Sequence, residues 1–159
     1  MTSIAASISP VTAPDLPDLV PLMEQYCAFY ETAPSREALT RLAESLLAAP
    51  DCEGVQLIAR GDDGQAVGFA TMYWSWDTTE AVPTAIMHDL YVAETGRRQG
   101  LGRALIDACA ELAAGRGKRR LDWQTAPANA TAQRVYDATA AERSTWVCYA
   151  LPLGDTMRR

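Results

Sequence analysis

The sequence predicts one mixed α/β domain over residues 1–159, with a central mixed β-sheet of about six to seven strands flanked by about four helices. Two observations lead to this prediction. In some stretches apolar and polar residues alternate, as in a half-buried strand. These stretches are interspersed along the chain with others whose apolar residues recur at helical spacing. No repeat, low-complexity segment or long linker divides the 159 residues, a length that one hydrophobic core can serve.

The N-terminal part is expected to form a short strand and then a helix. Residues 4–11 alternate as a strand does, and Thr12 and Asp15 are typical of the cap and first turn of a helix. The helix should continue over residues 19–31. It should be bent or broken at Pro21, because proline lacks the backbone donor that a helix interior needs.

The middle of the chain predicts a second helix followed by an antiparallel meander of strands. Ser35 is a good cap for a helix over residues 36–49. Residues 61–64, Gly-Asp-Asp-Gly, are typical of a hairpin turn. The strands expected here cover residues 55–60, 65–76 and 83–93.

The last part predicts alternating helices and strands. Residues 100–117 place apolar side chains on one helical face and end in glycine, as amphipathic helices commonly do. Three further elements are expected: a strand over residues 119–126, a helix over 128–141 and a closing strand over 144–153.

The composition narrows the classes of function. A net charge of −6, with one lysine among 14 basic side chains, argues against a general nucleic-acid binder. This charge suits a cationic substrate, although solubility alone would also explain it. One histidine and four cysteines without a CxxC pair argue against a metal site. Because no signal peptide and no long apolar run is present, we expect a cytoplasmic protein that makes no membrane contact.

The most informative stretch is residues 97–103, where a strand leads into a helix. The first backbone N–H groups of a helix have no internal partners, and glycine lets a ligand approach them closely. Arginine adds positive charge that suits phosphate oxygens. The stretch matches neither the Walker loop nor the three-glycine dinucleotide fingerprint. We interpret it as a pyrophosphate site, the alternative being turn glycines with solvated arginines: Arg97, Arg98, Gln99, Gly100, Leu101, Gly102 and Arg103.

Residues 97–102 resemble the [QR]-x-x-G-x-[GA] signature of the GNAT N-acetyltransferase superfamily, whose members hold the pyrophosphate of acetyl-CoA at this turn. Asn129 and Tyr136 resemble the Asn–Ala–Tyr pattern of the family's fourth helix. Three segments look most similar to the branch of diamine and polyamine acetyltransferases and yeast histone-and-polyamine acetyltransferases. They are QYCAFYE, VGFATMYWSW and LDWQTAPANATAQRVYD.

The resemblance implies the GNAT fold, acetyl-CoA as co-substrate with no metal, and direct attack of a primary amine on the thioester. It places Tyr136 beside the coenzyme sulfur, where a phenol can donate a proton to the departing thiolate. It places Asn129 at the pantetheine arm or at the start of the helix. The strand residues that would offer backbone groups to the pantetheine amides, as a neighbouring strand would, are Leu90, Tyr91 and Val92.

His88 is the candidate base that takes the proton of the amine. An alkylammonium with a pKa of about 10.4 is free amine in roughly one molecule in two thousand at neutral pH, equivalent to about 4–5 kcal/mol. Histidine ordinarily titrates near neutral pH, and His88 is the only one in the chain. The branch commonly carries a glutamate here, so this chain departs from it. The alternative is a strand histidine that faces solvent or bonds the backbone.

The candidate residues for binding the acceptor are carboxylates and aromatic side chains. Asp89 should lie on the opposite face of the strand from His88 if the strand is regular. The aromatic side chains can line a pocket and stack on a cation, or can pack in the core or a dimer interface. Besides His88, the residues assigned are Tyr30, Glu31, Trp74, Asp77 and Asp89.

The expected acceptor is a small primary amine such as a polyamine, an amino acid or a related amine. Acetylation of an antibiotic, a toxin or a protein lysine is the alternative reaction. A sensor that binds acyl-CoA without catalysis is the alternative from a different class. The aromatic closing segment over residues 144–153, taken with the branch, predicts a homodimer.

Overall fold

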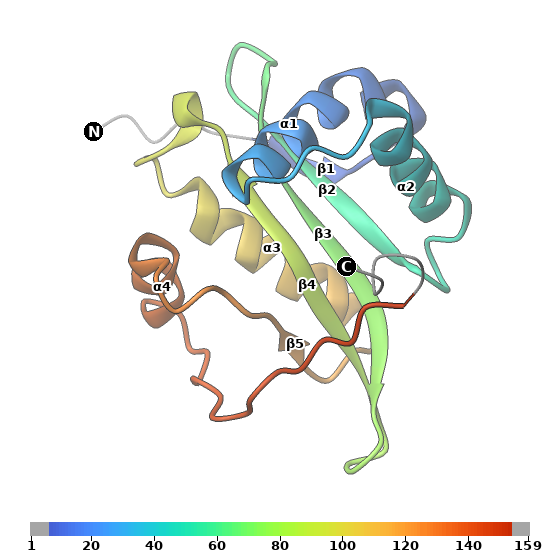
Figure 1. Ribbon diagram of the computed structural model, residues 1–159, viewed down its shortest axis with the longest axis vertical. Coiled ribbons are helices and arrows are strands. Elements are labelled where there is room, and N and C mark those ends of the chain that lie inside the picture. The colour runs from blue at the N-terminus through green and yellow to red at the C-terminus, as the bar shows by residue number, and fades with distance from the viewer. Residues whose placement is uncertain (1–6, 154–159) are drawn as a thin grey trace.

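The computed structural model describes residues 7–153. They form a five-stranded sheet with the strand order β1-β2-β3-β4-β5, together with four α-helices and two short 3-10 turns (Figure 1). The elements are β1 (Ser7–Pro10), η1 (Ala13–Asp15), α1 (Leu16–Phe29), α2 (Arg36–Ala48), β2 (Gly54–Arg60), β3 (Ala66–Asp77), β4 (Val82–Val92), η2 (Glu94–Gly96), α3 (Leu101–Gly115), β5 (Leu121–Asp122) and α4 (Ala130–Asp137).

The sheet is mixed, as the sequence predicts. Strands β1 to β4 pair antiparallel with their neighbours, and β5 pairs parallel with β4. Helices α1 and α2 pack on one face of the sheet and α3 packs on the other (Figure 1). The mixed α/β fold class is therefore confirmed.

The number of strands is lower than expected. Among residues 7–153 there are five strands rather than six or seven, because residues 144–153 follow α4 without any β pairing. This segment, red in Figure 1, is drawn as coil, and its large apolar side chains are exposed. The backbone groups of a strand need hydrogen-bond partners on a neighbouring strand, and no strand among residues 7–153 pairs with this segment.

The helix starts follow the expected capping chemistry. The Asp15 carboxylate accepts from the Thr12 backbone N–H at 2.9 Å and from the Thr12 hydroxyl at 2.7 Å. The Ser35 hydroxyl accepts from the backbone of Ala38 at 3.2 Å. The expected break at Pro21 is wrong, because α1 runs through it. Proline removes only one backbone bond near the helix start, and the surrounding apolar side chains are buried against the sheet.

Two apolar layers hold the helices to the sheet. On the side of α1 and α2, Phe69 is fully buried among helix side chains such as Leu19 and Met23. On the side of α3, Leu105 and Met72 are fully buried. Burying each such side chain contributes roughly 1.5–3 kcal/mol, so these layers fix the positions of the strands.

An ion pair connects the start of α1 to the sheet. The Arg60 guanidinium lies 2.7 Å from the Asp15 carboxylate and 2.8 Å from the Asp18 carboxylate. The hydrogen bond from Thr12 and the contact with Arg60 lower the pKa of Asp15 from 3.8 to about 2. Because this pKa is depressed, the ionised carboxylate stabilises the fold above about pH 4, and the contribution disappears as the pH falls toward about 2.

We expect Asp15→Asn to lower the free energy of unfolding by about 1–2 kcal/mol at neutral pH, since the neutral amide loses the charge contact. The difference from the wild type should shrink as the pH is lowered from about 4 toward 2. Urea unfolding followed by circular dichroism at a series of pH values measures it. Asp62→Asn, on the exposed hairpin, is the control. A difference that stays constant down to about pH 2.5 would contradict the assignment.

Candidate active site

Strand β4 is bonded along its whole length to β3 but only near its start to β5. The pairing with β3 runs from Val82 to Val92, whereas the pairing with β5 covers Ala85 and Ile86 alone. Beyond Ile86 the β5 side of β4 has no strand partner among residues 7–153 (Figure 1). We call the backbone of residues 88–92 on this side the open edge.

Alternate residues present their backbone groups at the open edge. Ala93 donates its N–H to a β3 carbonyl at 2.9 Å, so it faces β3. Because antiparallel partners alternate, Tyr91 also faces β3, and Leu90 and Val92 face the open edge. In agreement, the Val92 carbonyl accepts from Arg97 Nε at 3.1 Å. Of the three strand residues singled out in the sequence, two therefore direct backbone groups to this edge.

The turn that follows the open edge leaves the start of α3 uncovered. Arg98 and Gly100 adopt left-handed conformations, with φ of 62° and 77°. Gly100 is the cap of α3 and has no side chain to bond the first N–H groups of the helix, which stay available to a ligand. A Cβ atom at Gly102 would contact only the Val135 side chain, at 3.9 Å. This geometry suits an anion held by backbone donors.

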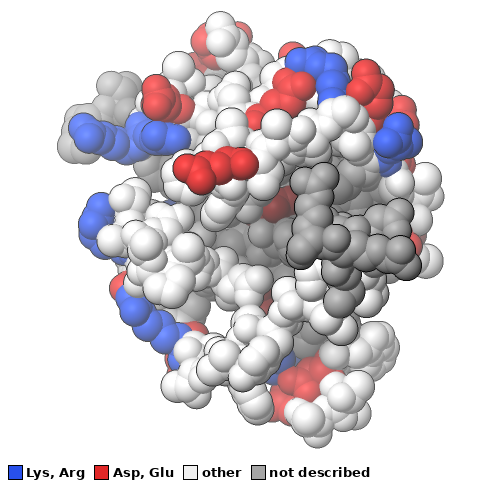
Figure 2. Space-filling view, viewed as in Figure 1, with Lys and Arg blue, Asp and Glu red and all other residues white. Residues whose placement is uncertain are grey.

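Two arginines of the turn are held by other parts of the protein. Arg97, besides its bond to β4, lies 3.8 Å from the Glu94 carboxylate. Arg103 donates to both Asp107 oxygens at 2.9 and 3.0 Å and to the Ala138 carbonyl at 2.7 Å, which joins α3 to the end of α4. In Figure 2, Lys and Arg side chains line the left edge of the molecule, where Figure 1 places this turn and α4.

A β-bulge in β4 brings His88 and Asp89 together. Thr71 lies opposite Asp89 while Met72 lies opposite Met87, so His88 is the extra residue of the bulge. The Nδ1 atom of His88 lies 3.2 Å from the Asp89 carboxylate. The expectation that these two side chains lie on opposite faces is therefore wrong, because the bulge interrupts the alternation of the strand.

Tyrosines from α1 and β3 lie near this pair. The Tyr73 ring meets the His88 imidazole edge to face at 5.6 Å, and the Tyr26 ring meets the Tyr30 ring at 5.1 Å. Burial raises the pKa of Tyr26 and of Tyr73, and the negative charge of Asp89 raises both pKa values further. The carboxylate and the aromatic faces together suit a cation. Sequence reasoning missed Tyr73, since it could not tell which of two neighbouring aromatic residues faces His88.

The end of α1 approaches α4 through two tyrosines. Burial raises the pKa of Tyr136, and the nearby Tyr30 raises it further. The Tyr136 ring packs edge to face on Trp123 at 5.6 Å, and Asn129 caps α4 by accepting from Ala132 N–H at 3.2 Å. Asn129 thus orders the helix that carries Tyr136. Glu31, next to Tyr30, is exposed and left-handed, with φ of 57°.

Trp74 lies on the other face of the sheet from Tyr73. Its indole N–H donates to the Pro50 carbonyl at 2.8 Å. The cationic groups of Arg116 and Lys118 lie over its ring, at 5.4 and 4.9 Å from the centroid. The assignment of Trp74 to the same pocket as His88 is therefore wrong, because successive side chains of a strand point to opposite faces.

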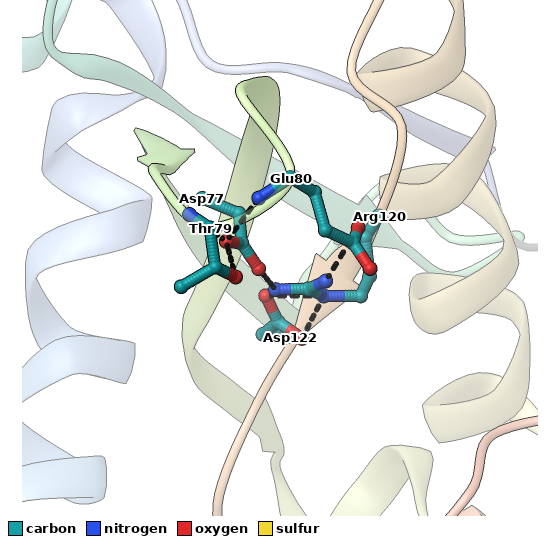
Figure 3. Close-up of polar contacts among 5 residues, drawn as sticks. All are labelled: Asp77, Thr79, Glu80, Arg120 and Asp122. Carbon is teal, nitrogen blue, oxygen red and sulfur yellow. Dashed lines mark hydrogen bonds and ion pairs between the residues drawn. The ribbon is translucent and has the colours of Figure 1, made fainter.

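Asp77 belongs to a separate ion-pair network at the far end of β3 (Figure 3). It accepts from the Thr79 hydroxyl at 2.6 Å and from Arg120 at 2.8 Å, and Arg120 also bonds Asp122 at 2.8 Å. These hydrogen bonds hold the pKa of Asp77 well below its usual range. The strand residue paired with Asp77 is about 20 Å from His88 along β4. The structure does not bring Asp77 to the other site residues.

A cavity of about 680 Å³ lies between the β2–β3 hairpin and the turn before α3. Its lining includes none of residues 88–92, so it is distinct from the open edge, but it shares Gln99, Gly100, Leu101 and Arg103 with the turn. Its wall includes Asp62, Gln65, Thr95, Gln99, Gly100 and Asp107.

Neither a metal site nor a membrane span is found in the described part of the chain. Within residues 7–153, no group of three His, Cys, Asp or Glu side chains is placed to hold a metal ion. No helix in the same range is long and apolar enough to cross a membrane.

Comparison with known sequences gives one family and several relatives. The model of the acetyltransferase (GNAT) family matches residues 19–140. An uncharacterized N-acetyltransferase of Bacillus subtilis (strain 168) is 30% identical over 133 residues, covering 82% of this chain and 86% of the relative. The aminoglycoside N(6')-acetyltransferase type 1 of Serratia marcescens is 35% identical over 113 residues, covering 69% of this chain and 76% of the relative.

Solved structures with the same fold include acetyltransferases. A crystal structure of a probable acetyltransferase has a TM-score of 0.82 and 28% identity, covering 94% of this chain and 99% of the other. An aminoglycoside N-acetyltransferase in complex with CoA has a TM-score of 0.81, covering 95% of this chain and 97% of the other. At 22% identity the second likeness is one of fold.

Proposed function

The chain belongs to the GNAT acetyltransferase family, and we propose that it transfers the acetyl group of acetyl-CoA to a primary amine of a small molecule. One observation carries the proposal: the open edge of β4 starts at His88, and the turn that follows it leads to the uncovered helix start of α3. Tyr136 packs in the same apolar cluster as the side chains of Leu90 and Val92. A thioester lying along this edge would have a base at one side and a proton donor at the other.

In this proposal the coenzyme is held mainly by backbone groups. The pantetheine arm lies along the open edge as an added strand, with Leu90 and Val92 as its backbone partners. The pyrophosphate accepts from the first N–H groups of α3, at Leu101 and Gly102, where the helix dipole favours negative charge. Arg98 supplies positive charge beside it.

The proposed reaction divides the proton transfers between two residues. His88 takes one proton from the ammonium, and the nitrogen lone pair then attacks the thioester carbon. The C–N bond forms and the C–S bond breaks, and the thiolate takes a proton from the Tyr136 phenol. The second amine proton restores the phenol, so one proton is released for each amide formed. The raised pKa of Tyr136 keeps the phenol protonated until the thiolate forms.

The acceptor we propose is a small cationic amine such as a polyamine or an amino acid. Asp89 supplies a carboxylate, and Tyr26, Tyr30 and Tyr73 supply aromatic faces, which together attract an alkylammonium. Glu31 adds a second carboxylate at the end of α1. A second candidate acceptor is an aminoglycoside, which the 35% identical relative from Serratia marcescens favours. A cytoplasmic location is part of the same proposal.

We also propose that the protein is a homodimer formed through residues 144–153. Trp146 and Tyr149 are 91% and 94% exposed, and Val147, Leu151 and Leu153 are exposed as well. Two such aromatic side chains would bury about 300–500 Å² of surface in each copy. With the aliphatic side chains added, the area buried by two symmetric copies approaches the roughly 1,200–2,000 Å² of a stable interface. Strand β5 pairs only with β4 among the described strands, so the same segment of a second copy can pair with its free edge.

The acceptor is tested by measuring CoA release from acetyl-CoA with a panel of polyamines, amino acids, aminoglycosides and a lysine peptide. We expect turnover with a small polycationic amine. Tyr136→Phe should lower kcat by about 10²-fold or more with little change in affinity for acetyl-CoA, because only the proton donor is lost. An unchanged kcat would remove Tyr136 from the reaction, and no turnover with any amine of the panel would contradict the proposed function.

Gly102→Val should weaken acetyl-CoA binding by about tenfold or more, measured by isothermal titration calorimetry. The reason is that the added methyl groups would cover the backbone donors, while the fold has room for the Cβ atom. Gly115→Val is the matched control, since it changes the same residue type at the far end of α3, where no atom lies within 4 Å of the new Cβ. Equal affinities of the two variants would contradict the assigned coenzyme site.

Light scattering coupled to size exclusion should give twice the 17.2 kDa mass of one chain. Replacing Trp146 and Tyr149 together by Asp should give the single-chain mass, because the interface would then bury two charges. Trp76→Asp is the control, since this tryptophan is 67% exposed but lies near the β3–β4 hairpin. A single-chain mass for the wild type would contradict the dimer.

A further inference from the structure

The β-bulge places His88 at the open edge, and it also brings the side chains of two consecutive residues into contact. In a regular strand, His88 and Asp89 would point to opposite faces. The extra residue in β4 instead leaves His88 Nδ1 at 3.2 Å from Asp89 Oδ1, which is hydrogen-bonding distance. From this geometry we propose that Asp89 is a positioning residue for His88. The inference rests on the proposed acetyl transfer.

Asp89 is less exposed than His88, as expected if Asp89 holds the imidazole in position. The Asp89 side chain is 16% exposed, whereas the His88 side chain is 63% exposed. The carboxylate is mostly covered by the fold, and the imidazole reaches toward solvent and an incoming acceptor. Tyr73 supports the imidazole from β3, edge to face at 5.6 Å. One ring nitrogen is thus held and the other is free to react.

The contact determines which nitrogen of the neutral imidazole carries the hydrogen. A carboxylate only accepts hydrogen bonds, so the contact forms when His88 Nδ1 carries the hydrogen. The Nε2 atom then has the free lone pair and is the base that takes a proton from the ammonium. After that transfer both nitrogens are protonated, and Asp89 stabilises the cation that has formed. The proton leaves to solvent before the next turnover, so the pair returns to its starting state.

The groups around the pair are consistent with this division of roles. Tyr26 and Tyr30 approach from α1 and Tyr73 from β3, and Glu53 lies close enough to add to the raised pKa of Tyr73. Tyr26 and Tyr73 are kept neutral by burial and by the charge of Asp89. They therefore act as phenols, and Tyr26, which hydrogen-bonds Asp89, holds the carboxylate in place beside His88.

The tautomer of His88 can be measured directly, because it is the only histidine in the chain. Long-range proton–nitrogen NMR spectra of the uniformly ¹⁵N-labelled protein distinguish the protonated ring nitrogen from the unprotonated one. We expect the wild type to carry its hydrogen on Nδ1. In Asp89→Asn the amide group can donate to Nδ1, and we expect the hydrogen to move to Nε2. Glu44→Gln, on the exposed face of α2, should leave the wild-type tautomer unchanged.

Activity gives a second, independent readout. Asp89→Asn should lower kcat by about 10²-fold or more, and Asp89→Glu, which keeps a carboxylate, should recover part of the loss. In a His88→Ala background, Asp89→Asn should change kcat by no more than about twofold, since a positioning residue has no effect on the chemical step without the residue it positions, while any loss of acceptor binding raises KM in both backgrounds. A purely structural role for Asp89 would lower kcat by the same factor in both backgrounds and would overturn the proposal.

The NMR readout separates this proposal from the proposed function. Hydrogen on Nε2 in the wild type would overturn the pairing whatever the activity. The expected tautomer and its change in Asp89→Asn would support the pairing even if no amine of the panel were acetylated. That second result would count against the acetyl-transfer function alone. The folding of each variant is checked by its backbone amide spectrum, and the tautomer of the wild type still tests the pairing if Asp89→Asn does not fold.

Discussion

The unequal pairing of β4 is the constraint on which the rest of the structure depends. Backbone N–H and C=O groups inside a protein need partners, and β3 satisfies one side of β4 from Val82 to Val92. On the other side β5 stops after two residues. The backbone groups of Leu90 and the N–H of Val92 can be satisfied by an extended molecule, while the Val92 carbonyl already accepts from Arg97. The turn of residues 93–100 then leads to the helix start of α3, whose first N–H groups suit an anionic group.

The bulge at His88 lies between the paired and unpaired parts of β4 and affects both its backbone and its side chains. Ala85 donates to the residue before β5, so odd-numbered residues face β5 ahead of the bulge. After the bulge the even-numbered residues do so, which gives the open edge its backbone groups. The same extra residue puts His88 and Asp89 within 3.2 Å of each other. One insertion therefore sets both the backbone groups of the open edge and the contact between His88 and Asp89.

Local patterns were sufficient to predict most helices and strands and the glycine turn before α3. The caps at Thr12 and Ser35, and the glycine turn before α3, each depend on residues close together in sequence. Features that depend on distant partners were not predictable. The bulge follows from the register between β3 and β4, and this register also decides that Tyr73 rather than Trp74 meets His88. The closing segment over residues 144–153 has strand-like composition, yet composition does not provide the neighbouring strand that it needs.

The Arg120 network of Figure 3 has a consequence for how the two strands separate. Arg120 bonds Asp77 at the end of β3 and Asp122 in β5, and Asp122 is opposite Ile86, the last paired residue of β4. Charge contacts at the surface thus hold the point from which β4 and β5 diverge. Such contacts weaken as ions screen them, whereas the apolar layers on either face do not. The point at which β4 and β5 diverge is therefore held by contacts that lose strength as the ionic strength rises, while the core is held by contacts that do not.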